Sequence, residues 1–202
     1  MGIGMGVAMM KEVYVIDTET STTHWTEGIP NGHIVEIGVA KVNLEKFTVL
    51  PTYQFVVSDS SADPEAWVFR NTDLTYDMVR TGTSPGTVSA FLEDRLKDKE
   101  VTSYNIQFDK MMIDRDMPYL NNVVDWGMDL MVQAANVPEI PRKHAGKDTW
   151  PKAEDSYNYL CPSDPCNLHG KEKHRALADA EMEGHILLEL YFRGLYRMKE
   201  EE

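Results

Sequence analysis

Short runs rich in Val and Ile, bounded by Gly, Pro and Asn, occupy the N-terminal third of the chain and are typical of β-strands. Residues 12–17, 33–43 and 48–57 form three such runs, and a polar loop over 20–32 separates the first two. Successive strands with short connections predict an antiparallel meander. Within it, Pro51 marks the third strand as an edge strand or the site of a bulge.

The remainder of the chain alternates helical and strand patterns. Ser84 followed by Pro85 is a helix start, with Ser84 as the N-cap. Apolar residues at three-four spacing over 174–199 predict the longest helix. The other predicted elements are short helices from Pro64 and over 74–80, strands over 100–104 and 123–125, and helices over 105–120, 127–136 and 151–160. Strands first, then strands alternating with helices, predict an α/β fold with a mixed sheet flanked by helices.

The length of 202 residues suits one sizeable core, which we assign to residues 11–202 after a flexible lead-in over 1–10. The net charge of −13 argues against coating nucleic acid or binding an anionic membrane, but not against an enzyme with local basic groups. No apolar run reaches membrane-spanning length, and two cysteines make no disulfide framework. These features predict a cytoplasmic protein without a membrane partner.

Two carboxylates stand two residues apart at the end of the first predicted strand, at Asp17 and Glu19. The period of two along a strand places both on one face. Burying them together without a partner would cost several kcal/mol, roughly, so a bound divalent cation is the simplest relief. Carboxylate oxygens suit Mg²⁺ or Mn²⁺. The alternative is a strand end with two solvated acids.

Further acids occur where helices begin. Asp109 follows the strand predicted over 100–104, and Asp179 stands near the start of the last helix with His174 five residues before it. Each alone has an ordinary explanation, because acids at a helix N-terminus are favoured by the helix dipole. A histidine before a helix is often a surface residue.

The ordered set of motifs resembles the DEDDh exonucleases. This ribonuclease-H-like family includes polymerase proofreading exonucleases, ribonuclease T and oligoribonuclease. The resemblance covers about residues 13–191. It rests on Val-Ile-Asp-Thr-Glu-Thr at 15–20, Ile-Val-Glu-Ile-Gly at 34–38, Ser-Tyr-Asn-Ile-Gln-Phe-Asp at 103–109 and His-Arg-Ala-Leu-Ala-Asp-Ala at 174–180. It implies a ribonuclease-H-like fold.

The resemblance also implies roles for the matching positions. His174 becomes the general base, on a loop from which it can swing over the site. Two metals, Mg²⁺ or Mn²⁺, about 3.5–4 Å apart can clamp a phosphodiester. The implied metal ligands are Asp17, Glu19, Asp109 and Asp179, and the implied substrate-binding residues are Thr20, Tyr104 and Asn105. Ser21 and Asn71 depart from residues common in the family, so contacts to the substrate end stay open.

The predicted function is a metal-dependent 3′→5′ exonuclease that releases nucleoside 5′-monophosphates. Its partner is nucleic acid with a free 3′ end, with single-stranded or frayed DNA favoured over RNA. A polymerase or replication protein is a further candidate partner. The alternatives are a 3′→5′ exoribonuclease acting on short RNA and a non-catalytic module of the same fold. All five catalytic positions carry the expected residue type, which argues against the non-catalytic module.

Three other patterns bear on substrate or metal binding. Basic residues around the last motif either contact backbone phosphates or are solvated loop charges; they are Arg142, Lys143, Lys147, Lys152, Lys171, Lys173 and Arg175. Among the aromatic residues Trp25, Phe69, Tyr104 and Trp150, some can stack on a base. Cys161, Cys166 and His169, followed by His174, have a loose zinc-site spacing. For the two cysteines, reduced thiols in a surface loop are the favoured interpretation.

Overall fold

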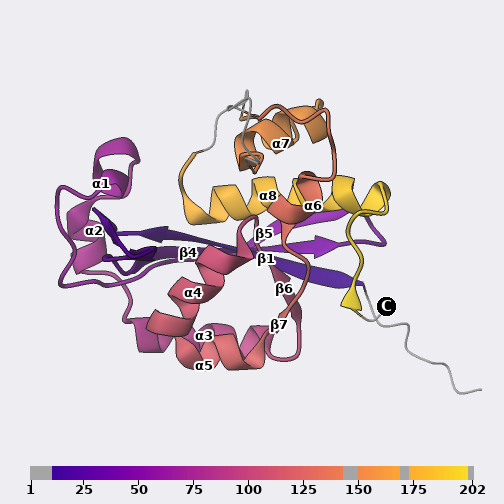
Figure 1. Ribbon diagram of the computed structural model, residues 1–202. Helices are drawn as coiled ribbons and strands as arrows, with labels where there is room; N and C mark the ends of the chain where they lie inside the picture. The colour runs from indigo at the N-terminus through magenta and orange to yellow at the C-terminus, as the bar shows by residue number, and fades with distance from the viewer. Residues whose placement is uncertain (1–10, 143–149, 169–172, 200–202) are drawn as a thin grey trace, which may run out of the picture.

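The computed structural model describes residues 11–142, 150–168 and 173–199; the predicted lead-in over 1–10 lies outside them. A five-stranded sheet with the order β5-β4-β1-β6-β7 runs through the centre of the molecule (Figure 1). Its strands are β1 (Glu12–Thr20), β4 (Ile34–Asn43), β5 (Thr48–Val56), β6 (Glu100–Thr102) and β7 (Asp125–Trp126).

The predicted antiparallel meander is confirmed, since β4 pairs antiparallel with both β1 and β5. The predicted mixed sheet is confirmed as well, because β6 runs parallel to β1 and β7 runs parallel to β6. Pro51 lies in edge strand β5 opposite Ala40, where the register shifts. Proline lacks the N–H that a ladder needs, so an edge position beside an irregularity is where a sheet accommodates it.

The loop predicted over 20–32 contains a small hairpin that the sequence pattern did not indicate. Its strands are β2 (Trp25–Thr26) and β3 (Ile29–Pro30). Glu27 and Gly28 form the two-residue turn between them, and both have positive φ, 52° and 81°. Positive φ at both central residues matches the right-handed twist of a tight hairpin.

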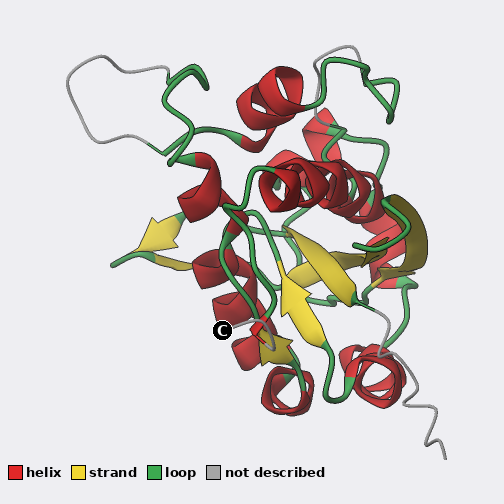
Figure 2. Cartoon of the chain, turned by 90° about the vertical axis from the view of Figure 1, so that its right-hand side faces the viewer, coloured by secondary structure: helices red, strands yellow, loops and turns green. Residues whose placement is uncertain are grey.

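Helices cover both faces of the sheet, as Figure 2 shows from the side. One face carries α6 (Leu130–Ala134), α7 (Ala153–Leu160) and α8 (Ala176–Phe192), and the other carries α3 (Pro85–Leu96), α4 (Ile106–Asp116) and α5 (Pro118–Val123). Short helices α1 (Trp67–Asn71) and α2 (Tyr76–Arg80) pack at one end of the sheet (Figure 1). Side chains alternate along β1, so the strand contributes to a hydrophobic core on each face of the sheet. Val13 and Val15 face α8, while Tyr14 and Ile16 face the side of α3, α4 and α5.

Two glycines allow α8 to lie directly on the meander. A Cβ at Gly38 of β4 would stand 2.2 Å from the carbonyl carbon of Ala176, at the start of α8. A Cβ at Gly184 would stand 2.7 Å from a Val49 methyl group. Neither distance is sterically possible, so the close approach requires glycine on each element. This packing fixes the N-terminus of α8 beside the end of β1.

Two helix predictions were too long. The helix predicted over 105–120 is divided into α4 and α5 at Met117, because Pro118 cannot continue the hydrogen-bond ladder. The helix predicted over 174–199 begins at Ala176 and ends at Phe192, before Gly194 with φ 70°. After this end the chain returns to the sheet, where the Tyr196 hydroxyl donates to Glu100 at 2.6 Å. The N-cap predicted at Ser84 is confirmed, since its side chain accepts the Thr87 N–H.

Candidate active site

The carboxyl-terminal end of β1 carries the first two predicted acids. Asp17 and Glu19 continue the alternation of Val13 and Val15, so they face the N-terminal part of α8. Both side chains are half-buried. Thr18, between them, points to the opposite face and toward α4.

Asp109 lies in the first turn of α4 and is 4% exposed. Its Oδ1 accepts a hydrogen bond from the Thr18 hydroxyl at 2.7 Å, which ties the start of α4 to the end of β1. Burial raises the pKa of Asp109 to about 7, even though hydrogen bonds such as that from Thr18 favour its ionised form. The helix start and the strand end thus bring Asp109 to the other predicted acids.

Asp179 projects from the first turns of α8 and is 1% exposed. Its carboxylate reaches back across the helix start, where it accepts the backbone N–H groups of Lys173 at 3.3 Å and Arg175 at 3.0 Å. Ligand atoms of Glu19, His174 and Asp179 all lie within 4.8 Å of one another. This spacing allows one cation to reach all three side chains.

A fifth acid, Glu183, belongs to the same group and was not predicted. It lies one helical turn after Asp179, is 3% exposed, and its Oε2 accepts the Tyr104 backbone N–H at 3.1 Å. The spacing of four from Asp179 places both on one helix face, and this spacing is the signal that could have identified it. We refer to Asp17, Glu19, Asp109, Asp179 and Glu183 as the carboxylate cluster.

The cluster is electrostatically crowded. The pKa of Asp17 is raised well above its ordinary value, first by burial and then by the charges of Glu183, Asp109, Glu19 and Asp179. Carboxylates that raise one another's pKa gain from a bound cation, which favours their ionised forms. Oxygen is the only donor that these five side chains offer, as hard cations such as Mg²⁺ and Mn²⁺ prefer.

His174 stands at the rim of the carboxylate cluster, on the loop before α8. Its φ of 51° is uncommon for a residue other than glycine, and its side chain is half-buried. The imidazole contacts the Trp67 ring of α1 edge to face, with centroids 4.8 Å apart. The histidine therefore has an aromatic contact on one side and the ligand atoms of Glu19 and Asp179 on another.

An ion-pair network fixes the residue between His174 and the helix. The Arg175 guanidinium donates to Glu36 of β4, with Nη2 to Oε1 at 2.6 Å and Nε to Oε2 at 2.9 Å, and also donates to Asp73. Glu36 is completely buried, and its Oε2 also accepts the Ala176 N–H at 3.1 Å. These contacts raise the pKa of Arg175, Glu36 first. Arg175 is thus used within the protein, which corrects its interpretation as a phosphate contact or a solvated charge.

The predicted substrate residues have different surroundings. Tyr104 is 6% exposed and its hydroxyl bonds Pro151 O at 2.9 Å and Ser156 at 2.6 Å, so its side chain belongs to the core. Thr20 ends β1 and donates to the Thr22 hydroxyl at 2.9 Å. Asn105 is exposed and lines a hollow of about 160 Å³ at the start of α4. Other residues of this hollow include Trp25 and Phe108, whose ring centroids lie 5.8 Å apart.

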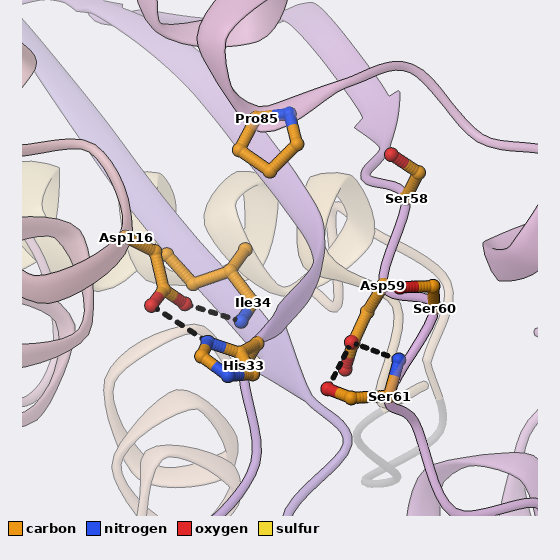
Figure 3. Close-up of a pocket in the computed structure, with 8 residues that line it drawn as sticks. All are labelled: His33, Ile34, Ser58, Asp59, Ser60, Ser61, Pro85 and Asp116. Atoms are coloured by element: carbon orange, nitrogen blue, oxygen red, sulfur yellow. Dashed lines mark hydrogen bonds and ion pairs between the residues drawn. The ribbon is translucent and has the colours of Figure 1, made fainter.

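A separate polar cavity of about 320 Å³ opens where β4 begins (Figure 3). In it, Asp116 of α4 accepts the His33 Nδ1 at 2.9 Å and the Ile34 N–H at 2.8 Å, and Asp59 accepts two bonds from Ser61 (Figure 3). Hydrogen bonds lower the pKa of both acids in spite of burial. Those from Arg115, Ile34 and His33 act on Asp116, and those from Ser61 and Ser21 act on Asp59. Ser58, Ser60 and Pro85 complete the lining.

Comparison with known proteins gives a family match over most of the chain. Residues 14–187 match the RNase T family model, described as an exonuclease. No curated protein matches. Among the described residues, no helix has the length and apolar character needed to cross a membrane.

Solved structures share the fold at low identity. The nuclease domain of 3′hExo, a DEDDh family member bound to rAMP, has a TM-score of 0.66 at 14% identity, with 95% of this chain and 98% of that chain covered. A 3′-exonuclease with the histone mRNA stem-loop has a TM-score of 0.68 at 15% identity, with 94% and 85% covered. E. coli exonuclease I with a dA16 oligonucleotide has a TM-score of 0.57 at 17% identity, with 90% of this chain and 41% of that chain covered. The chain spans 63% of a full-length 3′-exonuclease.

Proposed function

The chain belongs to the RNase T exonuclease family, and on that premise we propose that it hydrolyses phosphodiester bonds at nucleic-acid 3′ ends with divalent metal ions. Removal of one nucleotide at a time from the 3′ end would release nucleoside 5′-monophosphates. The observation that carries this proposal is the convergence of acids from β1, α4 and α8 in the carboxylate cluster.

The donor set of the cluster fits two divalent cations, Mg²⁺ or Mn²⁺. We assign Asp17, Glu19, Asp109 and Asp179 as the ligands. Their carboxylates converge, and bound cations would offset the repulsion between them. When bound, such cations supply Lewis-acid stabilisation of the charge that develops on a phosphodiester during hydrolysis. Glu183 adds negative charge beside Asp17, and its bond from the Tyr104 N–H ties the segment between β6 and α4 to α8.

His174 is the general base in this proposal. An imidazole can accept a proton from water near neutral pH. His174 lies on the loop before α8, and the next residue, Arg175, is anchored to Glu36. The anchor holds the imidazole within reach of the site that Glu19 and Asp179 define.

The 3′-terminal nucleotide would lie between Thr20 and Asn105, which flank the carboxylate cluster on β1 and at the start of α4. The aromatic pair Trp25 and Phe108 beside Asn105 offers a stacking surface for a base. Stacking tolerates any base, so this arrangement supports action on single strands without strong sequence preference. In this proposal Tyr104 acts through its backbone N–H, which donates to Glu183, and its side chain does not contact the substrate.

Single-stranded or frayed DNA remains our first substrate, and RNA is the second candidate. One observation favours RNA: this chain covers 98% of a relative solved with rAMP and 85% of a relative solved for its recognition of a histone mRNA stem-loop. The relative solved with dA16 is a longer chain, of which 41% is covered. The 2′-hydroxyl distinguishes the two substrates at a single contact.

The direct test is Mg²⁺-dependent digestion of matched single strands, DNA and RNA, labelled at either end. We expect immediate release of a labelled mononucleotide from the 3′ label and a shortening ladder from the 5′ label. Asp17→Asn is the inactive control, and Asp116→Asn is the matched acid outside the cluster. Cleavage that starts from the 5′ end, or full activity of Asp17→Asn, would refute the proposal.

A further inference from the structure

A second group of metal-ligand side chains lies on the other side of α8. Cys166, Glu181 and His185 each place one ligand atom within 4.8 Å of the others. Glu181 and His185 are one helical turn apart. At about 100° per residue, they lie roughly 200° around the helix from Asp179 and Glu183. This group is therefore separate from the carboxylate cluster.

The loop that carries Cys166 is held in place by its own hydrogen bonds. The Cys166 N–H donates to the Tyr157 hydroxyl at 2.9 Å, and this hydroxyl donates to Asp164 Oδ1 at 3.0 Å. The same Oδ1 accepts the Leu168 N–H at 2.8 Å. Tyr157 is 1% exposed and belongs to the core, so Cys166 is positioned against α8 by buried structure. The site is pre-organised by the fold.

We propose that Cys166, Glu181 and His185 form a binding site for a transition-metal cation, with Zn²⁺ as the best fit. Zinc accepts sulfur, imidazole nitrogen and carboxylate oxygen in a tetrahedral arrangement. Bonds of about 2.0–2.3 Å put ligand atoms about 3.3–3.8 Å apart, so the observed spacing requires only small side-chain rotations. Magnesium does not fit, because it prefers oxygen ligands.

The protonation of the ligands is consistent with this site. Burial lowers the pKa of His185, which keeps its imidazole neutral and able to coordinate. Burial raises the pKa of the Cys166 thiol to about 11, while Lys173 and the Tyr157 hydroxyl oppose the increase. A metal would displace the thiol proton, so binding is expected to release protons.

This ligand set differs from the loose pattern in the sequence. Among the described residues of that pattern, Cys166 belongs to this group, whereas Cys161 lies in the core at 5% exposure. His169 lies outside the described residues. The new ligands Glu181 and His185 come from α8 and stand 15 and 19 positions after Cys166 in the sequence. A metal here would link the loop after α7 to α8, and it would stabilise the folded protein by binding it in preference to the unfolded chain.

Cobalt substitution tests the proposal with a readout that the carboxylate cluster cannot give. The protein is stripped with a chelator and titrated with Co²⁺, and thiolate-to-cobalt absorption in the near ultraviolet is recorded. We expect one equivalent to saturate this band, and one equivalent of Zn²⁺ to abolish it and raise the melting temperature. Cys166→Ser should lose the band, and Glu181→Gln or His185→Gln should weaken Co²⁺ binding at least about tenfold.

Matched controls separate this site from others. Asp17→Asn removes a member of the carboxylate cluster, and His24→Gln removes a histidine exposed on the surface; both should keep the band. Absence of the band in the folded wild-type protein would overturn the proposal. So would a band that persists at unchanged affinity in both Glu181→Gln and His185→Gln, or that depends on Cys161 instead of Cys166. None of these outcomes depends on nuclease activity.

Discussion

Two groups of acids lie at the same end of the sheet and behave in opposite ways. Asp59 and Asp116 line the cavity where β4 begins, and Ile34 in that cavity pairs with Thr20 at the end of β1. There, hydrogen-bond donors lower the pKa of both acids. In the carboxylate cluster, burial and neighbouring carboxylates raise the pKa of Asp17, and burial raises that of Asp109.

Under the proposed function, the difference separates an acid that stabilises the fold from an acid that binds a cation. Asp116 supplies acceptors that the start of β4 needs, so its charge stabilises the fold. The acids of the carboxylate cluster face one another, and their ionisation destabilises the fold until a cation binds. Ionisable groups whose arrangement lowers the stability of the fold are typical of functional sites.

Removal of one acid from each group gives the largest contrast. Asp17→Asn should lower exonuclease activity roughly 10³-fold or more, because it removes a proposed metal ligand. Its melting temperature without metal should rise, since repulsion is relieved. Asp116→Asn should keep activity and lose about 1–3 kcal/mol of stability, because an amide keeps only one of the two oxygens that accept from His33, Ile34 and Arg115. Activity assays and denaturant unfolding of the two variants check this pair.

Loss of the proposed base should have the next largest effect. We expect His174→Gln to lower turnover by about 10²-fold or more, the usual contribution of general-base catalysis. Affinity for Mn²⁺ should change little, because the carboxylates remain. Turnover and metal titration measured on the same preparation check the separation; equal losses in both would assign His174 to metal binding.

Loss of the paired bonds between Arg175 and Glu36 should have a smaller but measurable effect on turnover. Arg175→Lys keeps the charge but cannot make the paired bonds to Glu36, so we expect kcat to fall about tenfold at nearly constant KM. Arg95→Lys is the matched control, since Arg95 pairs with Asp94 on the exposed surface of α3. An equal fall in both variants would exclude a positioning role for Arg175.

The two groups also predict opposite dependence of stability on pH. Asp109 has a pKa of about 7 in the folded protein, against about 3.9 in the unfolded chain. The folded state therefore holds this proton more tightly, and the free energy of unfolding decreases as the pH rises between these two values. Without metal, stability should increase as the pH falls from about 8 to 5. Asp59 and Asp116 have lowered pKa values, so their contribution is present above about pH 4 and is lost in more acidic solution.

Melting temperatures measured between pH 5 and 8, with and without Mg²⁺, check the direction in which stability changes with pH. Saturating Mg²⁺ should remove most of the change between pH 8 and 5, because bound cations keep the cluster ionised. Asp17→Asn should reduce the same change without metal. A metal-free protein that becomes steadily more stable from pH 5 to 8 would contradict the assignment.

The sequence was sufficient for the elements with strong local signals. Strand patterns identified the meander, and the Ser84–Pro85 start identified α3. The motifs predicted that Asp17, Glu19, Asp109 and Asp179 belong to one site. The division at Met117 was missed because helical spacing continues across Pro118. The hairpin around Gly28 was missed because its strands are two residues long.

The partners of the site depend on tertiary structure. Glu36 and Arg175 are 139 positions apart, and only the packing of α8 on Gly38 brings them together. The participation of Glu183 depends on the Tyr104 N–H, a contact over 79 positions. Tyr104 looked available for substrate, but Ser156 and Pro151 enclose it. Such contacts leave no local pattern in the chain.

Direct Mn²⁺ binding tests the central claim that the crowded acids hold the catalytic cations. Electron paramagnetic resonance of free Mn²⁺ would be followed during titration of the wild-type protein, Asp17→Asn and Asp116→Asn. We predict two bound ions in the wild-type protein and in Asp116→Asn, and loss or strong weakening of at least one in Asp17→Asn. Unchanged binding in Asp17→Asn, with loss in Asp116→Asn, would contradict the account.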